Sequence, residues 1–339
     1  MDYAALWFVL LGLLLFGYAV LDGFDLGTGI VHLFTAKTDQ ERRILINAIG
    51  PLWDGNEVWL VTFGGALFAA FPPVYAAVLS GLYLPFMLLL FALIFRAVAI
   101  EFRSKNPSPR WRSAFDTAFA VASFGAALLM GTAVGSLVWG LPIGPQGQFV
   151  GGLWDIVHPF SLLVGAMAVA LFGLHGAVYL RLKTEGDLQA RMTPWAWRFF
   201  GIFVVLFVLV TIVALIERPQ VARFVAEDVW GYGVILALVL ALGNVPRALF
   251  SNRWGQAFLS TIVLIGALVV LFGAAIAPAL VPSSIDPALS LTIRNAASSQ
   301  KTLGIMTLMA AIGMPMVVAY TVVVYWTFRG KVKLDEFSY

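Results

Sequence analysis

The sequence predicts an all-α protein that crosses a membrane many times. Of its 339 residues, 61% are hydrophobic and only 12% are charged, whereas soluble domains have about 25% charged residues. The apolar residues also fall into long stretches, and about 20 apolar residues are enough for a helix to cross a bilayer. Composition and segment length together predict a polytopic membrane protein.

Turn signals divide these stretches into nine predicted transmembrane helices. Pro72-Pro73 ends the second helix, Asn106-Pro107-Ser108-Pro109 ends the third, and the Gly- and Pro-containing stretch 140–152 ends the fourth. In chain order the predicted helices cover roughly 4–34, 44–72, 74–102, 113–139, 154–182, 195–217, 227–249, 257–281 and 299–328. The longest of them are expected to tilt or to protrude from the bilayer.

The helices are expected to form two four-helix bundles, covering residues 1–140 and 153–282. The ninth helix and the tail, residues 298–339, are expected at the periphery. A short internal repeat is a weak sign of duplication, since Leu52-Trp53-Asp54 recurs as Leu153-Trp154-Asp155. Small residues allow close helix contacts in membranes, and the glycines of the first two helices that suit such contacts are Gly23, Gly27, Gly29, Gly64 and Gly65.

Basic residues orient the chain, because cytoplasmic loops of membrane proteins are enriched in Lys and Arg. If the N-terminus is outside, 17 of the 21 basic residues fall on the inner side. The outer segments then hold only Arg218, Arg223, Arg294 and Lys301. The predicted topology therefore has the N-terminus outside and the C-terminus in the cytoplasm.

Composition also excludes several kinds of functional site. The chain has no cysteine, which excludes disulfides, thiolate metal sites and c-type haem attachment. A net charge of +3 gives no signal for nucleic-acid binding. The first apolar stretch lacks a basic n-region and carries acids where a cleavage site would lie, so we expect it to remain in the protein.

Four acids interrupt the first two predicted helices: Asp22 and Asp25 in the first, and Asp54 and Glu57 in the second. An ionisable group at membrane depth is energetically costly unless it is paired, hydrated or turned toward the protein interior. Each pair has i,i+3 spacing and shares a helix face. The predicted topology places both pairs in the cytoplasmic half, which favours a path or site for protons, cations or a polar substrate.

Three further interpretations compete for these residues. His32, His158 and His175 are the only histidines available as haem ligands, and nothing in the sequence brings two of them together. Asp22, Asp25, Asp54, Asn56 and Glu57 could supply oxygen ligands to a metal, but their spacing matches no metal-binding loop, so no metal is expected. Asp25 or Asp54 could simply pair with Arg96 or Arg103.

A proton route fits the four acids better, because buried carboxylic acids can hold and release protons nearer neutral pH. A transporter that couples H⁺ or Na⁺ to a solute is the alternative function. Transporters favour midplane sites on repeated halves with broken helices. Here the acids lie in the first two helices, and the second half has no matching set.

Several motifs resemble subunit II of the cytochrome bd-type quinol oxidases, and the likeness runs over nearly the whole chain. They are the stretch from Tyr18 to Gly27 (YAVLDGFDLG), Glu41-Arg42-Arg43 with Asn47, Trp53 to Trp59 (WDGNEVW), Gly64 to Ala70, Phe95-Arg96, Phe102 to Lys105, and Trp154 to Leu180 with Pro159-Phe160 and His175-Gly176-Ala177.

The resemblance implies a heterodimer with a haem-bearing subunit I, often with a small single-helix subunit, in the bacterial cytoplasmic membrane. Such a complex oxidises quinol and reduces O₂ to water with protons from the cytoplasm. Haems b558, b595 and d and the quinol site are then expected in subunit I, and this chain would hold no cofactor except a structural quinone. Asp54 matches the family's Trp-Asp acid, which leads protons toward subunit I, and Asp25 matches the second acid of Asp-Gly-Phe-Asp. Glu57 stands where some members have Gln.

Overall fold

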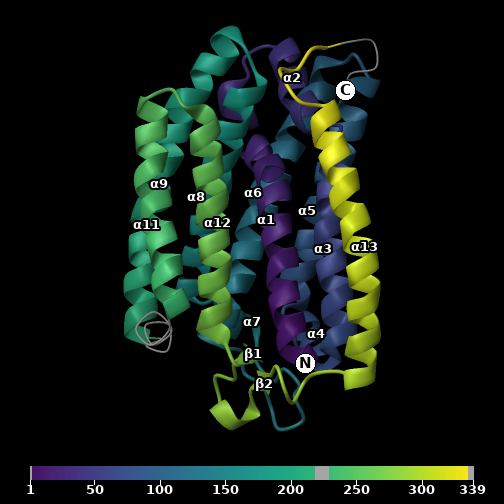
Figure 1. Cartoon of the computed structure of the whole chain (residues 1–339). Helices are drawn as coiled ribbons and strands as arrows, with labels where there is room; N and C mark the ends of the chain where they lie inside the picture. Colours follow the sequence, from purple (N-terminus) through teal and green to yellow (C-terminus); the bar gives the residue numbers. More distant parts are fainter. Residues whose placement is uncertain (1, 218–228, 335–339) are drawn as a thin grey trace.

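The computed structural model describes residues 2–217 and 229–334, which form a bundle of long helices running up and down (Figure 1). Loops and a two-stranded antiparallel sheet cover its lower end. In chain order the elements are α1 (Tyr3–Thr35), α2 (Asp39–Ile49), α3 (Trp53–Ala70), α4 (Pro72–Gly81), α5 (Tyr83–Phe102), η1 (Arg103–Lys105), α6 (Pro109–Trp139), α7 (Leu153–Ile156), α8 (Pro159–Lys183), α9 (Gly186–Glu217), α11 (Val229–Phe250), α12 (Trp254–Ile276), β1 (Ala279–Val281), η2 (Pro287–Leu289), β2 (Leu291–Thr292) and α13 (Gln300–Thr327).

Eight of the described helices are long and apolar enough to cross a membrane: α1, α5, α6, α8, α9, α11, α12 and α13. The remaining predicted span, residues 44–72, is interrupted after residue 49. Pro51 has no N–H to donate to the helix, so the segment divides into α2 and α3. Polar residues at the start of α3 lower its mean hydropathy, and the count of nine spans therefore stays a prediction.

Proline also moves other predicted boundaries. The segment 74–102 is divided into α4 and α5, because Pro85 cannot donate to the carbonyl of Gly81. Helix α8 starts at Pro159, five residues after its predicted start, and Pro is favoured at the first helical position. The helix predicted to reach residue 281 ends at Ile276, two residues before Pro278, and the chain continues into β1.

Helix α1 runs through the middle of the bundle and packs closely on α8 (Figure 1). The two backbones meet at Gly27 and Gly176. A Cβ at Gly27 would lie 1.9 Å from the Phe172 carbonyl oxygen, and one at Gly176 would lie 2.3 Å from the carbonyl carbon of Gly27. Only glycine fits at this crossing, as the sequence suggested for Gly27.

The apolar core crosses the predicted boundary between bundles. One large cluster of buried residues joins α1 and α5 with α8, α9, α11 and α12. A second cluster, at the lower end, joins the start of α1 and α4 to β1 and β2. Because the large cluster draws on both halves of the chain, the division into bundles at 1–140 and 153–282 stays a prediction, as does the separate unit at 298–339.

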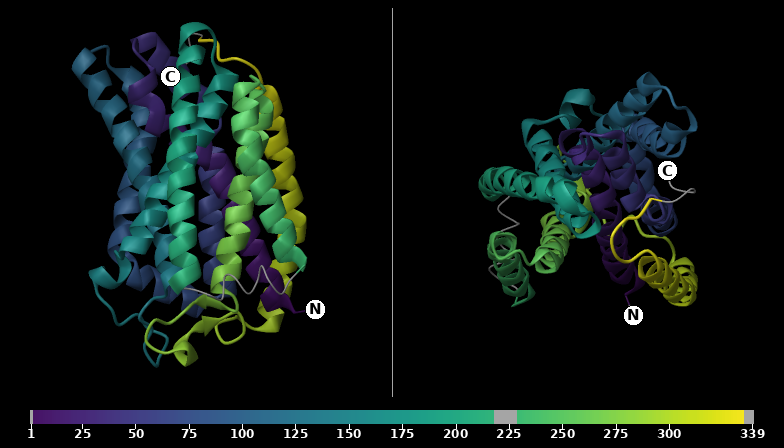
Figure 2. Two further views of the ribbon diagram at one scale, coloured as in Figure 1. Left: turned by 90° about the vertical axis from the view of Figure 1, so that its left-hand side faces the viewer. Right: turned by 90° about the horizontal axis from the view of Figure 1, so that it is seen from above.

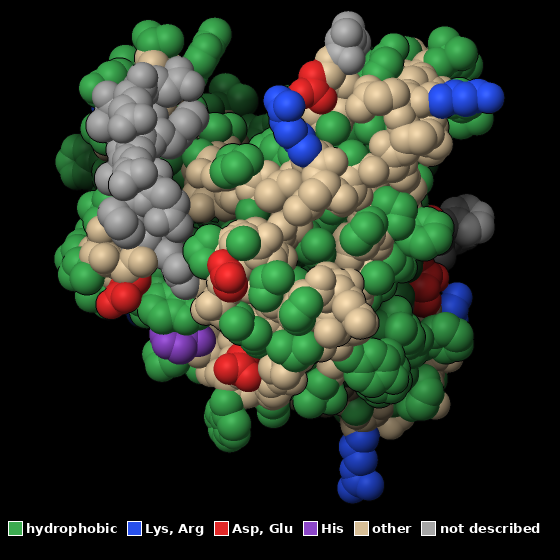
Figure 3. Space-filling model, turned by 90° about the horizontal axis from the view of Figure 1, so that it is seen from below, with side chains coloured by type: hydrophobic (Ala, Val, Ile, Leu, Met, Phe, Trp, Pro, Cys, Tyr) green, Lys and Arg blue, Asp and Glu red, His purple; other side chains and the backbone are tan. Residues whose placement is uncertain are grey.

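The two ends of the molecule differ in charge. Helix α1 starts at the lower end and α13 finishes at the upper end (Figures 1 and 2). The loops that follow α1, α5, α8, α11 and α13 lie at the upper end, and these loops together with the helix ends beside them carry most of the basic residues. Few Lys and Arg side chains show on the lower end (Figure 3). This polarity agrees with the charge pattern of the sequence, whereas the direction of the chain in the membrane stays a prediction.

We expect Gly176→Ala to weaken the packing of α1 on α8, because the added methyl group would meet backbone that cannot move aside. Overpacking of this kind costs about 1–3 kcal/mol. Thermal unfolding of the purified protein measures the effect. Gly201→Ala is the control, because a Cβ added at Gly201 would meet no atom within 4 Å. Equal unfolding midpoints for the two variants would contradict the tight crossing.

Candidate functional site

Three of the four predicted acids meet where α1, α3 and α5 pack together. Arg96 of α5 donates through Nη2 to Asp22 Oδ1 at 2.6 Å and also to Glu57 Oε1. Asp22 and Arg96 are fully buried, and the Glu57 side chain is 22% exposed. A guanidinium buried among apolar helices needs such partners, since breaking a buried ion pair costs about 3–5 kcal/mol.

Asp25 lies one turn beyond Asp22 on α1 and has a neutral partner. Asn56 Nδ2 donates to Asp25 Oδ2 at 2.7 Å and to the Leu21 carbonyl oxygen at 3.2 Å. The Tyr325 hydroxyl of α13 donates to Asn56 Oδ1 at 3.0 Å. We call Asp22, Asp25, Asn56, Glu57 and Arg96 the acid cluster.

The acid cluster has hydrogen-bonding capacity that the described protein atoms leave unused. Asp22 Oδ2, Asp25 Oδ1, and Arg96 Nε and Nη1 are buried and lack a protein partner, as does the nearby Tyr18 hydroxyl. Enclosed water is the usual partner of such groups. The site is therefore polar inside and able to hydrogen-bond further.

Asp54 does not join the acid cluster. It lies in the first turn of α3, one turn before Glu57, and its side chain is exposed on the surface of the chain. The expected alternative partners are corrected as well. Arg96 pairs with Asp22 and Glu57, which lie at its level between the helices, and not with Asp25 or Asp54.

Arg103 pairs with an acid that the sequence interpretation missed. It lies two turns beyond Arg96, where Asp116 of α6 accepts from Arg103 Nε at 2.6 Å. Asp116 Oδ1 also lies 2.8 Å from His32 Nε2, and its Oδ2 accepts from Arg42 Nη1 at 2.8 Å. Asp116 is an acid inside a predicted apolar helix, so the rule that singled out Asp22 and Asp25 would have found it.

Asp39 extends this second group toward solvent. It accepts from Arg103 Nη2 and from Arg112 Nη1, each at 2.8 Å. We call His32, Asp39, Arg42, Arg103, Arg112 and Asp116 the Asp116 network. It ties the end of α1, the short helix α2 and the facing ends of α5 and α6 into one charged clamp.

Glu41 fixes the start of α2 beside this clamp. Its side chain accepts from the backbone N–H of Lys37 at 2.7 Å and of Thr38 at 3.1 Å, and from Arg191. Thr38 caps the N–H of Glu41 in return, which completes a capping box. Burial raises the pKa of Glu41, but these hydrogen bonds outweigh it and hold the pKa below its ordinary value.

The other two histidines already have protein partners. His175 Nδ1 lies 2.7 Å from Thr261 Oγ1, and its Nε2 lies 3.1 Å from the Val20 carbonyl oxygen. His158 Nδ1 accepts from the Phe160 backbone N–H at 3.2 Å, and the ring stacks on Trp139. Within the described ranges, no three His, Asp or Glu side chains are grouped to hold a metal ion.

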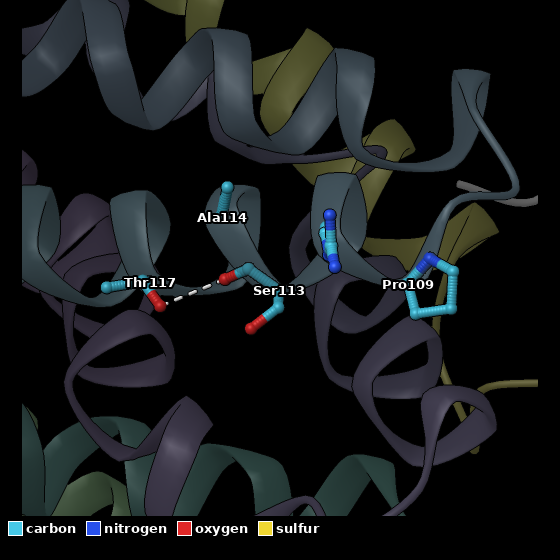
Figure 4. Close-up of a pocket in the computed structure, with 5 residues that line it drawn as sticks. Pro109, Ser113, Ala114 and Thr117 are labelled. Carbon is cyan, nitrogen blue, oxygen red and sulfur yellow. Dashed lines mark hydrogen bonds between the residues drawn. The ribbon is translucent and has the colours of Figure 1, made fainter.

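Two surface depressions are lined by residues outside the acid cluster. One follows the first turns of α6 and is lined by Pro109, Arg110, Ser113, Ala114 and Thr117 (Figure 4). The Thr117 hydroxyl there donates to the backbone carbonyl of Ser113.

Comparisons with known proteins agree with each other. Residues 3–328 match the family model described as cytochrome bd terminal oxidase subunit II. Cytochrome bd-I ubiquinol oxidase subunit 2 of Escherichia coli K12 is 34% identical, with 99% of this chain and 97% of that protein aligned. Cytochrome bd ubiquinol oxidase subunit 2 of Bacillus subtilis 168 is also 34% identical, with 98% and 97% aligned.

The fold has a solved counterpart. A chain in the structure of bd oxidase from Geobacillus thermodenitrificans matches with a TM-score of 0.77 at 18% sequence identity. The match covers 97% of this chain and 99% of that chain. At this identity the likeness shows a shared fold.

Replacement of Asp116 by Asn should destabilise the protein strongly. The variant leaves Arg103 and Arg42 beside a neutral amide that can accept fewer hydrogen bonds, and loss of a buried charge partner costs about 3–5 kcal/mol. Thermal unfolding in detergent measures the loss. Asp187→Asn, at an exposed residue of α9, should leave the midpoint unchanged. A stable Asp116→Asn protein would contradict a structural role for the network.

Glu41 should make stability depend on pH in a defined direction. A carboxyl group whose pKa is lowered by folding stabilises the folded state above its unfolded pKa, and the stabilisation is lost as the pH falls through the folded value. The difference in unfolding midpoint between the wild type and Glu41→Gln should therefore be full at neutral pH and shrink below the ordinary Glu value of 4.5. A difference that stays constant as the pH falls below that value would refute this assignment.

Proposed function

Because the chain belongs to the cytochrome bd terminal oxidase subunit II family, we propose that it is the non-haem subunit that supports subunit I and delivers cytoplasmic protons to it. The chain is a subunit of a cytochrome bd quinol oxidase, an oxidoreductase complex. Haem cofactors of the complex follow from the family. The proton route is the part of the proposal that the chain's own residues support.

The charge balance of the acid cluster carries the proposal. Asp22, Asp25 and Glu57 gather around Arg96, which is the one guanidinium that the described residues place among them. Uncompensated buried charge is costly, so three ionised carboxylates beside one cation are unfavourable. The cluster is therefore suited to hold one or two protons on its carboxyl groups and to exchange them.

A path for protons between the buried acids and Asp54 also has physical support. Carboxylic acids, the Tyr18 hydroxyl and water can pass a proton along hydrogen bonds. Buried atoms of Asp22, Asp25 and Arg96 that have no protein partner can take part in such a chain of hydrogen bonds. Glu57, the partly exposed member, lies one turn from the exposed Asp54. We assign Glu57 the step between the buried acids and Asp54.

The setting of Asp54 favours a protein partner at this face. Exposed apolar side chains follow it by one and two turns on α3, at Val58 and Val61. An ionisable group turned toward lipid is costly at this depth. We propose that subunit I covers this face, so that Asp54 hands protons across the subunit interface.

The histidines support haem in the partner rather than in this chain. Both ring nitrogens of His175 are engaged by protein atoms, and His32 Nε2 is engaged by Asp116. These contacts do not suit axial ligation of a haem iron. We therefore propose that haems b558, b595 and d lie in subunit I.

Further parts of the assembly follow from the family. We propose nine membrane spans in the bacterial cytoplasmic membrane, with the N-terminus outside and the C-terminus in the cytoplasm. A small single-helix subunit and a structural quinone are proposed on the same ground, with quinol and lipid as further contacts. The transporter alternative is not favoured, because every comparison leads to an oxidase subunit.

Asp54→Asn should lower quinol oxidase turnover at least about tenfold, the scale of a lost proton-transfer group, while haem content stays normal. Oxygen consumption by the purified complex, divided by haem content, is the measurement. Asp155→Asn is the matched control, because Leu153-Trp154-Asp155 repeats the local sequence at the opposite end of the molecule. Wild-type turnover in a haem-loaded Asp54→Asn complex would contradict the proposed role of Asp54 in proton transfer.

Asp25→Asn serves as the companion variant for the buried part of the route. It removes a carboxyl group that can carry a proton but keeps the size of the side chain. We expect reduced turnover or weaker haem retention. Normal activity together with a normal haem spectrum would remove Asp25 from the route.

A further inference from the structure

Helix α13 supplies a polar side chain to the acid cluster, although most of the helix lies on the outside of the bundle (Figures 1 and 2). The Tyr325 hydroxyl reaches Asn56, which is 269 residues away in sequence. Its ring packs edge-on against Phe24 of α1, with the centroids 6.4 Å apart. A peripheral helix therefore touches the partner of Asp25.

The neighbours of Asn56 determine which way its amide points. The Leu21 carbonyl can only accept, so the nitrogen must face it. The same nitrogen donates to Asp25, and the amide oxygen then faces Tyr325, which must donate. Asn56 is 2% exposed, and without the hydroxyl its oxygen would lose its observed hydrogen-bond donor.

Contacts beyond the helix hold Tyr325 in place. Lys183 at the end of α8 donates to the Phe328 carbonyl at 2.6 Å, and its own carbonyl accepts from Val332 N–H at 2.9 Å. Lys331 Nζ donates to the Thr184 carbonyl at 2.7 Å. The segment after α13 thus straps the end of the helix to the end of α8.

We propose that Tyr325 is a positioning residue for proton exchange at Asp25, acting by holding the Asn56 amide with its N–H toward the carboxyl group. The inference rests on the proposed role of the acid cluster as a proton route. A hydrogen bond donated to a carboxylate favours its ionised form. Tyr325 thereby promotes release of the proton from Asp25.

Other groups face Asp25 from every helix around it. They are Asp22 on α1, Asn56 and Glu57 on α3, Arg96 on α5, Tyr179 on α8 and Tyr325 on α13. Replacement of Tyr325 by Phe removes one hydroxyl group and changes no charge. A change in pH dependence would then report on the orientation of Asn56, whose amide can turn so that its oxygen accepts a hydrogen bond from protonated Asp25.

The test compares Tyr325→Phe with Tyr83→Phe in the purified complex with its partner subunit. Tyr83 lies at the start of α5 and is 64% exposed. We expect Tyr325→Phe to lower turnover per haem about threefold and to move the alkaline limb of its pH profile upward by roughly half a unit, the scale of a weakened hydrogen bond to a charge. Tyr83→Phe should change neither.

An infrared difference spectrum across the same pH range gives a second readout. The carboxylic acid band that disappears in Asp25→Asn should shift in Tyr325→Phe, and normalisation to haem makes this readable even if the variant assembles poorly. An unshifted band and pH profile, with Asp25→Asn still impaired, would overturn the inference alone. Normal turnover in both Asp25→Asn and Asp54→Asn would instead overturn the proposed function.

Discussion

The polar interior depends on the ion pairs that Arg96 forms. A bilayer offers no water to charges at its centre, so a buried guanidinium must find acids within the protein. Asp22 and Glu57 meet this need from two different helices. The pairing explains how α3, with three polar residues at its start and a low mean hydropathy, lies against the apolar helices α1 and α5. The same contact brings Asp25 and Asn56 to one level.

The Asp116 network and the acid cluster, both in the upper half of the molecule, suit different roles. Asp116 is surrounded by Arg103, Arg42 and His32, so each of its oxygens is satisfied and the cations outnumber the acid. Such a group resists change and suits a clamp. The acid cluster is the reverse in charge, with acids in excess of its cation. Both groups contain buried polar atoms without a protein partner, for example Arg103 Nη1 and Asp25 Oδ1, so the excess of acid is what distinguishes the acid cluster.

The sequence predicted the membrane class, most of the helices and the neighbourhood of three of the four acids. Periodic apolar stretches and prolines are local signals, and the gathering of Asp22, Asp25 and Glu57 followed from helix depth. The partners were harder to predict, because the pairing of Arg96 depends on how α1 and α3 approach α5, and the pairing of Arg103 depends on where α6 lies. Tyr325 carried no local signal at all, since its role comes from a contact across almost the whole chain.

In the proposed function, Asp54 and Tyr325 let this subunit influence proton delivery to subunit I. Asp54 stands at the surface of α3 beside apolar residues, where only a protein neighbour makes an acid tolerable. Tyr325 reaches the same cluster from α13, where its hydroxyl donates to Asn56. In the proposed route, small changes in hydrogen bonding would be enough for the buried acids to take up or release a proton. The close crossing at Gly27 and Gly176 would hold α1 in place during that transfer.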